Sequence, residues 1–296
     1  LKPKVRCVLT LQNRGAGLPD GGLFTAEQFN KKSDAEPAQG QKPARGAVEV
    51  KATSDDAWRT AKTEQVTDYW KEYGQILVTN YRDFLLIGRD KGAPVALDSY
   101  RLADGETDFW KKAQHPRTTA KAQGNLFVDF LTQVLLHPAR ITDSETVAWF
   151  LASYAREARA RVAGKDIAGL AALRKGLEEA LGMKFEGDEG EHFFRATLVQ
   201  TLFYGVFSSW VLWARNLGFR TSERFNWHEA AWSLHVPMIA SLFQEIATPQ
   251  SLKPLGLDEV LDRTQRVLNR VDRAAFFDKF EEEHAVQYFY EPFLKA

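Results

Sequence analysis

The sequence has little sulfur and no excess of either charge. Of its 296 residues only Cys7 is a cysteine, so no disulfide can form within the chain, which favours a reducing compartment such as the cytoplasm. Lysine and arginine together number 39, as do aspartate and glutamate, so the net charge is zero. The sequence therefore has no basic arm of the kind that indicates nucleic-acid binding. We expect this chain alone to bind DNA weakly, with an affinity that falls as the salt concentration rises.

Several functional motifs are also absent. No apolar run is long enough to span a bilayer, no glycine-rich loop has the G-x4-G-K-[ST] form, and no N-P-P-Y methyltransferase motif occurs. A membrane span, a P-loop motor and a methyltransferase site are thereby excluded for this chain. His228 and His235 are too far apart for the H-E-x-x-H zinc helix. Cys7 has no nearby histidine, so we expect a buried small apolar residue rather than a nucleophile.

The chain does contain what a globular protein needs. Its residues are 44% hydrophobic and 26% charged, and its length fits two domains. Short strand-like and helical patterns alternate over residues 1–115, whereas long helical patterns fill residues 116–296. We therefore predict an α/β (α+β) domain over 1–115, followed by an all-helical domain over 116–296.

One short strand carries two charges on a single face. Gly46–Ala52 is rich in small and β-branched residues, and alternation sends Glu49 and Lys51 to one face and Val48 and Val50 to the other. Charged groups on an otherwise apolar strand are costly to bury unless something pairs with them. A divalent metal and a phosphate would do so, because hard cations bind carboxylates and phosphate oxygens. The other interpretation is an edge-strand surface pair.

The segments around this strand complete a pattern. Pro19-Asp20 precedes it, so Asp20 can supply a second carboxylate or can simply be a turn residue. A helix is predicted over 57–73, capped at Ser54-Asp55 and ended by Gly74, with Gln65 and Tyr69 on one face. The strands 75–80 and 83–88 then predict a hairpin, and residues 27–45 predict a loop or hairpin.

Together these segments resemble the PD-(D/E)xK nuclease superfamily, in the variant with a Q-x-x-x-Y helix after the catalytic strand. The resemblance implies a restriction-endonuclease-like fold with a central mixed sheet and a catalytic set of Asp20, Glu49, Lys51, Gln65 and Tyr69. It implies Mg²⁺, or Mn²⁺ in its place, bound by Asp20 and Glu49, with the Val50 carbonyl as a further candidate ligand. Lys51 would orient the attacking water or help deprotonate it. Tyr69 could instead serve only to pack its helix on the sheet.

The helical part carries a second resemblance. Residues 225–231 and, most closely, residues 267–294 are similar to the helical connector of single-chain restriction–modification enzymes, which fuse a nuclease to an adenine-specific DNA methyltransferase and a target-recognition domain. The chain then looks like a piece of a longer bacterial or archaeal protein, with S-adenosylmethionine used only in a domain outside it. The resemblance implies double-stranded DNA and those two domains as partners.

The leading hypothesis is therefore a magnesium-dependent DNA endonuclease module with a helical coupler, located in the cytoplasm. Two alternatives stay open. One is a non-catalytic docking module that has the nuclease fold, and the other is a DNA-repair nuclease unrelated to methylation.

Overall fold

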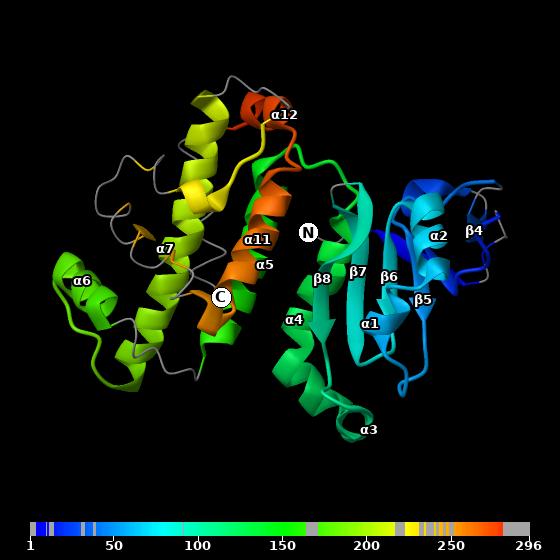
Figure 1. Cartoon of the computed structure of the whole chain (residues 1–296), viewed down its shortest axis with the longest axis horizontal. Coiled ribbons are helices and arrows are strands. Elements are labelled where there is room, and N and C mark those ends of the chain that lie inside the picture. The colour runs from blue at the N-terminus through cyan, green and yellow to red at the C-terminus, as the bar shows by residue number, and fades with distance from the viewer. Residues whose placement is uncertain are drawn as a thin grey trace. The chain divides into compact units, whose positions relative to one another are not determined.

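The computed structural model contains two compact units, Leu1–Ala139 and Arg140–Ala296 (Figure 1). None of the helices it describes is long and apolar enough to cross a membrane. The residues it describes are 4–9, 11, 15–30, 33–37, 40–90, 92–163, 171–216, 223–230, 234, 240, 243–244, 247–248 and 252–280.

The first unit is built on a six-stranded mixed sheet with the strand order β1-β2-β5-β6-β7-β8. β5 and β6 are parallel, and the other neighbouring strands are antiparallel. A separate hairpin of β3 and β4 fills part of the segment predicted as a loop or hairpin. The strands are β1 Val5–Leu9, β2 Gly21–Thr25, β3 Phe29–Asn30, β4 Ser33–Pro37, β5 Ala47–Val50, β6 Ile76–Thr79, β7 Asp83–Asp90 and β8 Ala93–Arg101.

Alternation along β5 divides its side chains between two apolar cores, as predicted. Ala47 belongs to the core that also contains Val66 and Tyr69 from the helix after β5. Val48 and Val50 lie in the opposite core, with Phe130 and Val134 of a later helix. Glu49 consequently shares the face of Ala47 and Tyr69.

The segment predicted as one helix over 57–73 forms two, α1 Ala57–Thr60 and α2 Glu64–Tyr73. Thr63 begins α2 as a new N-cap, because its hydroxyl accepts from the Val66 N–H. The first cap is Asp56, whose carboxylate accepts from two backbone N–H groups, and not the predicted Ser54-Asp55. Gly74 ends α2 in the left-handed conformation, as expected.

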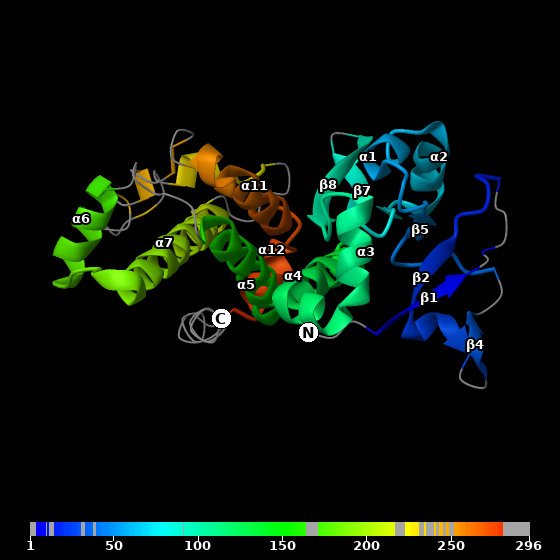
Figure 2. The same cartoon turned by 90° about the horizontal axis from the view of Figure 1, so that it is seen from below.

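Helices on the opposite face extend the first unit beyond the predicted boundary at 115. α3 Glu106–Gln114 leads into α4 Pro116–Leu136, whose Phe130 and Val134 pack on the sheet. Gln75 is buried and donates to the Val134 carbonyl at 2.9 Å, which fixes α4 to the start of β6. Figure 2 shows α1 and α2 on one side of the sheet and α3 and α4 on the other. A helical pattern in the sequence thus becomes the third layer of the first unit.

The entry to β5 depends on a glycine. Gly46 has φ 88°, and a Cβ added there would lie 2.4 Å from the Gln75 carbonyl oxygen. That same oxygen accepts from the Ala47 N–H at 3.0 Å, so the backbones of β5 and β6 meet closely at their start. Only a residue without a side chain allows this approach.

Cys7 is exposed on β1, which contradicts the prediction of a buried residue. β1 is an edge strand, so its apolar composition did not indicate burial on both faces. Partial burial still raises the pKa of the Cys7 thiol, which disfavours the thiolate.

The second unit consists of helices joined by loops in its described residues, with one isolated β-bridge between Ile141 and Val271. α5 and α11 pack together, and Glu157 of α5 pairs with Arg161 and with Arg263 of α11. Its elements are α5 Ser144–Val162, α6 Ala171–Leu181, α7 Gly187–Asn216, η3 Trp227–Glu229, η4 Lys253–Leu255, α11 Leu257–Leu268 and α12 Arg273–Asp278.

The described helices of this unit fall within the range predicted to be helical, residues 116–296. α5 begins after an Asp143 cap, and α7 begins at Gly187. His235 and the part of the connector-like segment over 281–294 lie outside the described residues. A mixed α/β unit followed by helices is therefore the observed fold class.

Candidate active site

The sheet brings the two predicted carboxylates close together. Gly21 pairs with Val48 and Gly22 with Ala47, and continuing this register past the end of β2 brings Asp20 alongside Glu49, whose pKa its charge raises. Residues opposite each other in such a pair point to the same face of the sheet. Asp20 Oδ2 also accepts from the Val50 N–H at 2.7 Å, which holds Asp20 at the end of β5.

Lys51 follows β5 directly and neutralises Glu49. The backbone N–H of Lys51 donates to the Thr79 carbonyl of β6 at 2.8 Å, and its Nζ lies 2.5 Å from Glu49 Oε1. Glu49 is only 2% exposed, whereas the Lys51 side chain is 33% exposed. The pair therefore runs from the interior toward the surface at the carboxyl end of β5.

The electrostatics of Glu49 show how close the charged groups are. Burial raises the pKa of the Glu49 carboxyl, Lys51 opposes this rise, and the negative charge of Asp20 adds to it. The hydrogen bond to Glu49 raises the pKa of the Lys51 ammonium, and Asp20 and Tyr69 contribute in the same direction. A buried carboxylate, an exposed carboxylate and a partly exposed cation thus interact at the end of β5.

Tyr69 joins this group from α2. Its ring is buried in the core beside Ala47, and its hydroxyl accepts from Gln65 Nε2 at 2.8 Å. Burial raises the pKa of Tyr69, as do the charges of Glu49 and Asp20. The ring therefore packs the helix on the sheet, while the hydroxyl remains within the electrostatic reach of the carboxylates.

Gly17 makes room for this phenol. It has φ 96°, and a Cβ at this position would lie 3.2 Å from Tyr69 Cε1. Gly17 was not among the predicted site residues, although a glycine two residues before Pro19-Asp20 is a signal for a close backbone approach. With Gly17, all the predicted site residues, Asp20, Glu49, Val50, Lys51, Gln65 and Tyr69, gather around the end of β5.

The turn of the predicted β6–β7 hairpin lies next to this cluster, and Asn80, which the sequence did not single out, holds it in place. Asn80, which is fully buried, accepts from the N–H groups of Arg82 and Asp83 at 3.0 and 2.7 Å. Its Nδ2 donates to the Asp55 carbonyl at 2.7 Å, and Arg82 Nε donates to the Thr53 carbonyl at 2.7 Å. The turn between β6 and β7 is thereby bound to the loop that follows Lys51.

Replacing Asn80 with alanine is expected to lower the free energy of unfolding by about 3 kcal/mol, because three hydrogen bonds are lost and buried backbone groups are left without partners. Chemical denaturation measures this change. Asn125 is exposed on α4, so Asn125→Ala serves as the matched control and should leave stability nearly unchanged. Equal stability of the two variants would show that Asn80 does not hold the turn.

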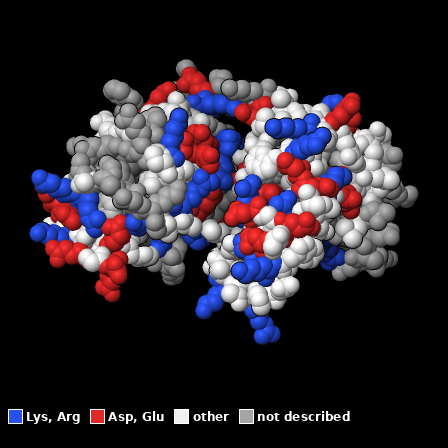
Figure 3. Space-filling model, turned by 60° about the horizontal axis from the view of Figure 1, so that its bottom comes forward, with Lys and Arg blue, Asp and Glu red and all other residues white. Residues whose placement is uncertain are grey.

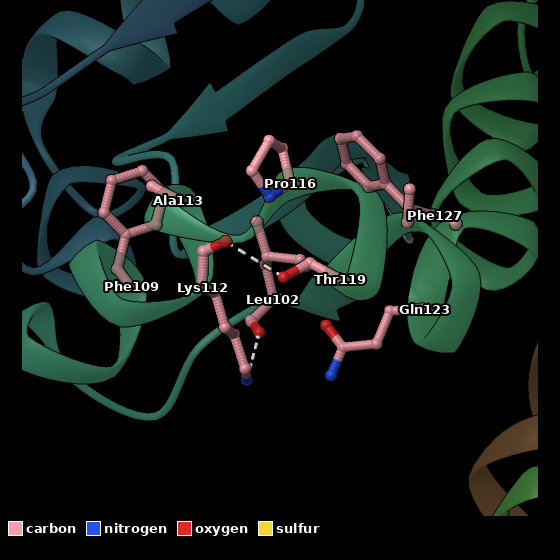
Figure 4. A pocket seen from close by; sticks show the side chains of 10 residues that line it. Leu102, Phe109, Lys112, Ala113, Pro116, Thr119, Gln123 and Phe127 are labelled. Carbon is pink, nitrogen blue, oxygen red and sulfur yellow. Dashed lines mark hydrogen bonds between the residues drawn. The ribbon is translucent and has the colours of Figure 1, made fainter.

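A pocket of about 400 Å³ lies elsewhere in the first unit, between α3 and α4. Figure 4 shows Lys112 Nζ bound to the Leu102 carbonyl and the Thr119 hydroxyl bound to the Lys112 carbonyl. These polar groups are engaged by the protein itself, and the remaining lining is mostly carbon. None of its lining residues belongs to the carboxylate cluster; they are Leu102, Phe109, Lys112, Ala113, Pro116, Thr119, Ala120, Gln123, Gly124 and Phe127.

The face of the molecule drawn in Figure 3 has no patch of a single charge sign. On the face drawn in Figure 3, acidic and basic side chains alternate in small groups over both units. This mixture agrees with a net charge of zero. Long-range attraction of a polyanion therefore contributes little, and short-range contacts must select a substrate.

The donor set of the cluster suits a hard divalent cation. Asp20 and Glu49 offer carboxylate oxygens on the same face of neighbouring strands, and magnesium sites commonly use one or two carboxylates together with substrate oxygens and waters. Among the described residues no group of three or more His, Cys, Asp or Glu side chains could hold a metal without such help. A metal at this position would thus depend on two carboxylates and on oxygens from outside the protein.

Comparisons with family models, with curated proteins and with solved structures found no match to this chain. The geometry of the cluster and the residue pattern in the sequence are therefore the basis for a functional assignment.

Proposed function

We propose that the first unit is a metal-dependent DNA endonuclease module, which hydrolyses phosphodiester bonds with Mg²⁺ or Mn²⁺. The observation that carries the proposal is the position of Asp20 beside Glu49 at the end of β5, with Lys51 paired to Glu49 at the exposed end of the strand. A restriction-endonuclease-like fold agrees with the mixed sheet, with the parallel pair of β5 and β6, and with α2 between them.

Each residue of the cluster has a distinct task in this proposal. Asp20 and Glu49 hold the cation, which supplies Lewis-acid stabilisation of the charge that develops on the phosphate. Lys51 reaches from Glu49 toward solvent, where its ammonium group orients the attacking water and offsets negative charge. Tyr69 packs α2 on the sheet beneath the site, and Gln65 fixes the direction of its hydroxyl.

The burial of Glu49 beside a second carboxylate favours an enzyme over a non-catalytic docking module. A docking surface gains nothing from a carboxylate that is 2% exposed and lies beside a second carboxylate. Such an arrangement is costly for folding, and costly charge clusters are typical of sites that use the charge.

The helical unit would connect the nuclease to further domains. In sequence, its residues 267–294 resemble the connector of single-chain restriction–modification enzymes, and this supports a parent polypeptide with an adenine-specific methyltransferase and a target-recognition domain. Those domains would select the DNA sequence, because this chain has no base-reading motif and a net charge of zero. S-adenosylmethionine would bind there and not in this chain.

Binding of Mn²⁺ tests the proposal directly. In a titration followed by electron paramagnetic resonance, the 296-residue chain should remove the signal of free Mn²⁺, because bound Mn²⁺ gives a broader signal. Asp20→Asn keeps an acceptor for the Val50 N–H and removes the charge, so we expect its affinity for Mn²⁺ to fall by a factor of at least about ten.

Asp68→Asn is the matched control, because Asp68 is an exposed carboxylate on α2 that pairs with Lys71. It should bind Mn²⁺ as the unaltered chain does. Equal affinity of all three proteins would contradict a metal site at Asp20.

A further inference from the structure

The turn between β6 and β7 holds a tyrosine in an unfavourable backbone conformation. Tyr81 has φ 67° and is the one non-glycine residue with a positive φ among the residues that the structure describes. Glycine, asparagine and aspartate are the residues that adopt this left-handed conformation readily, whereas a bulky side chain does so at a cost. Such outliers persist where the surroundings enforce them, and they cluster at functional sites.

Three neighbouring side chains enforce this conformation. The Tyr81 N–H donates to Thr79 Oγ1 at 2.9 Å, and Thr79 Oγ1 in turn donates to the Asp83 carbonyl at 2.9 Å. Asn80 and Arg82 bind the turn to the loop over 53–55, as described above. Tyr81 itself contributes only its backbone to these contacts.

The turn is adjacent to the carboxylate cluster. Thr79 accepts from the Lys51 N–H through its carbonyl and from the Tyr81 N–H through its hydroxyl, so a single residue links the two. Because β5 and β6 are parallel and Val50 pairs with Thr79, their carboxyl ends lie at the same edge of the sheet. Tyr81 is therefore fixed at the edge where Lys51 emerges.

The side chain of Tyr81 is exposed to solvent. It is 49% exposed, and Trp58, which follows the loop bound by Asn80, is 39% exposed. Arg82, the next residue in the chain, has its guanidinium group held by the carbonyl oxygens of Thr53 and Asp55. Exposed aromatic rings together with a cation are the elements that bind nucleic-acid strands, since bases stack on the rings and the cation attracts phosphate.

We propose that Tyr81 stacks on a nucleobase that has left the helical stack beside the scissile phosphate. This inference rests on the proposed nuclease function and adds a substrate contact to it. The preformed turn fixes the backbone of Tyr81 before binding, so less conformational entropy is lost when the base arrives. A strained tyrosine at this position is then explained by the substrate and not by the fold.

Two substitutions distinguish the contribution of the Tyr81 ring from that of its backbone conformation. Tyr81→Gly removes the ring and suits a positive φ, so the thermal midpoint of unfolding should be unchanged or higher. Tyr81→Phe keeps the ring and removes the hydroxyl. Tyr204→Ala is the matched control, because Tyr204 is 44% exposed on α7 of the other unit.

The assay is single-turnover nicking of supercoiled plasmid with Mn²⁺, measured against the concentration of the 296-residue chain. Tyr81→Gly is expected to raise the half-saturating concentration about ten- to a hundredfold, which is the usual contribution of one stacked base to binding affinity. Tyr81→Phe and Tyr204→Ala should behave as the unaltered chain. In Tyr81→Gly the maximal rate should change less than the half-saturating concentration.

Two results would overturn the stacking role alone: a Tyr81→Gly variant that saturates as the unaltered chain does, or a Tyr81→Phe variant that loses as much as Tyr81→Gly. An unaltered chain that fails to nick DNA at any concentration, with Mn²⁺ bound or not, would overturn the nuclease proposal and this inference with it. The two failures are therefore distinguishable.

Discussion

Replacing Lys51 with alanine is expected to lower the maximal rate of DNA cleavage by a factor of about a hundred to ten thousand, the usual effect of removing a group that positions a proton or a water in the transition state. The ammonium group of Lys51 lies at the exposed end of its pair with Glu49, where a substrate phosphate can reach it. Asp20 and Glu49 remain in place in the variant, so binding of Mn²⁺ should persist while turnover is lost. Single-turnover nicking at saturating protein, combined with the Mn²⁺ titration, measures both quantities.

Lys71→Ala is the matched control for this change. Lys71 also pairs with a carboxylate, Asp68, at 2.7 Å, but it does so on the exposed face of α2. Its removal should leave cleavage unchanged, because exposed ion pairs contribute little. A Lys51→Ala variant that cuts at the unaltered rate would show that Lys51 is only the structural partner of Glu49.

The sequence predicted the centre of the site because that centre follows a simple period. Alternation along residues 46–52 was enough to place Glu49 on one face of the strand and Val48 and Val50 on the other. The structure confirms this division. The end of α2 at Gly74 and the hairpin of β6 and β7 were also predictable, since glycine and a short polar turn are strong local signals.

What the sequence could not show depends on contacts between distant segments. Asn80 is an ordinary turn residue in the sequence, and only the fold brings it to Asp55 and gives Tyr81 its left-handed conformation. α4 has a helical pattern like those of the second unit, and its packing on the sheet is set by Gln75, Phe130 and Val134. Local patterns identify elements, whereas their partners are decided by tertiary packing.

Replacing Glu49 with glutamine is expected to abolish cleavage and, in the absence of divalent metal, to stabilise the protein at pH 8. Glu49 is 2% exposed, and both burial and the charge of Asp20 raise the pKa of its carboxyl. A group whose pKa is raised by folding contributes its full stability only at low pH and loses this contribution as the pH rises through the folded-state pKa. At pH 8 the ionised carboxylate is therefore a cost, which the neutral amide avoids.

The dependence of the thermal midpoint on pH and on metal distinguishes a metal site from a structural ion pair at Glu49. In EDTA the thermal midpoint of Glu49→Gln should exceed that of the unaltered chain at pH 8, and the difference should shrink as the pH falls, because the protonated carboxyl resembles the amide. Saturating Mn²⁺ should reverse the order, since a ligand at about a hundred times its dissociation constant adds about 2.7 kcal/mol to the chain that binds it and nothing to the variant. A Glu49→Gln variant that is less stable than the unaltered chain in EDTA at pH 8 would identify Glu49 and Lys51 as a stabilising structural pair. The reversal by metal would instead show that bound metal offsets the destabilisation caused by the buried Glu49 carboxylate.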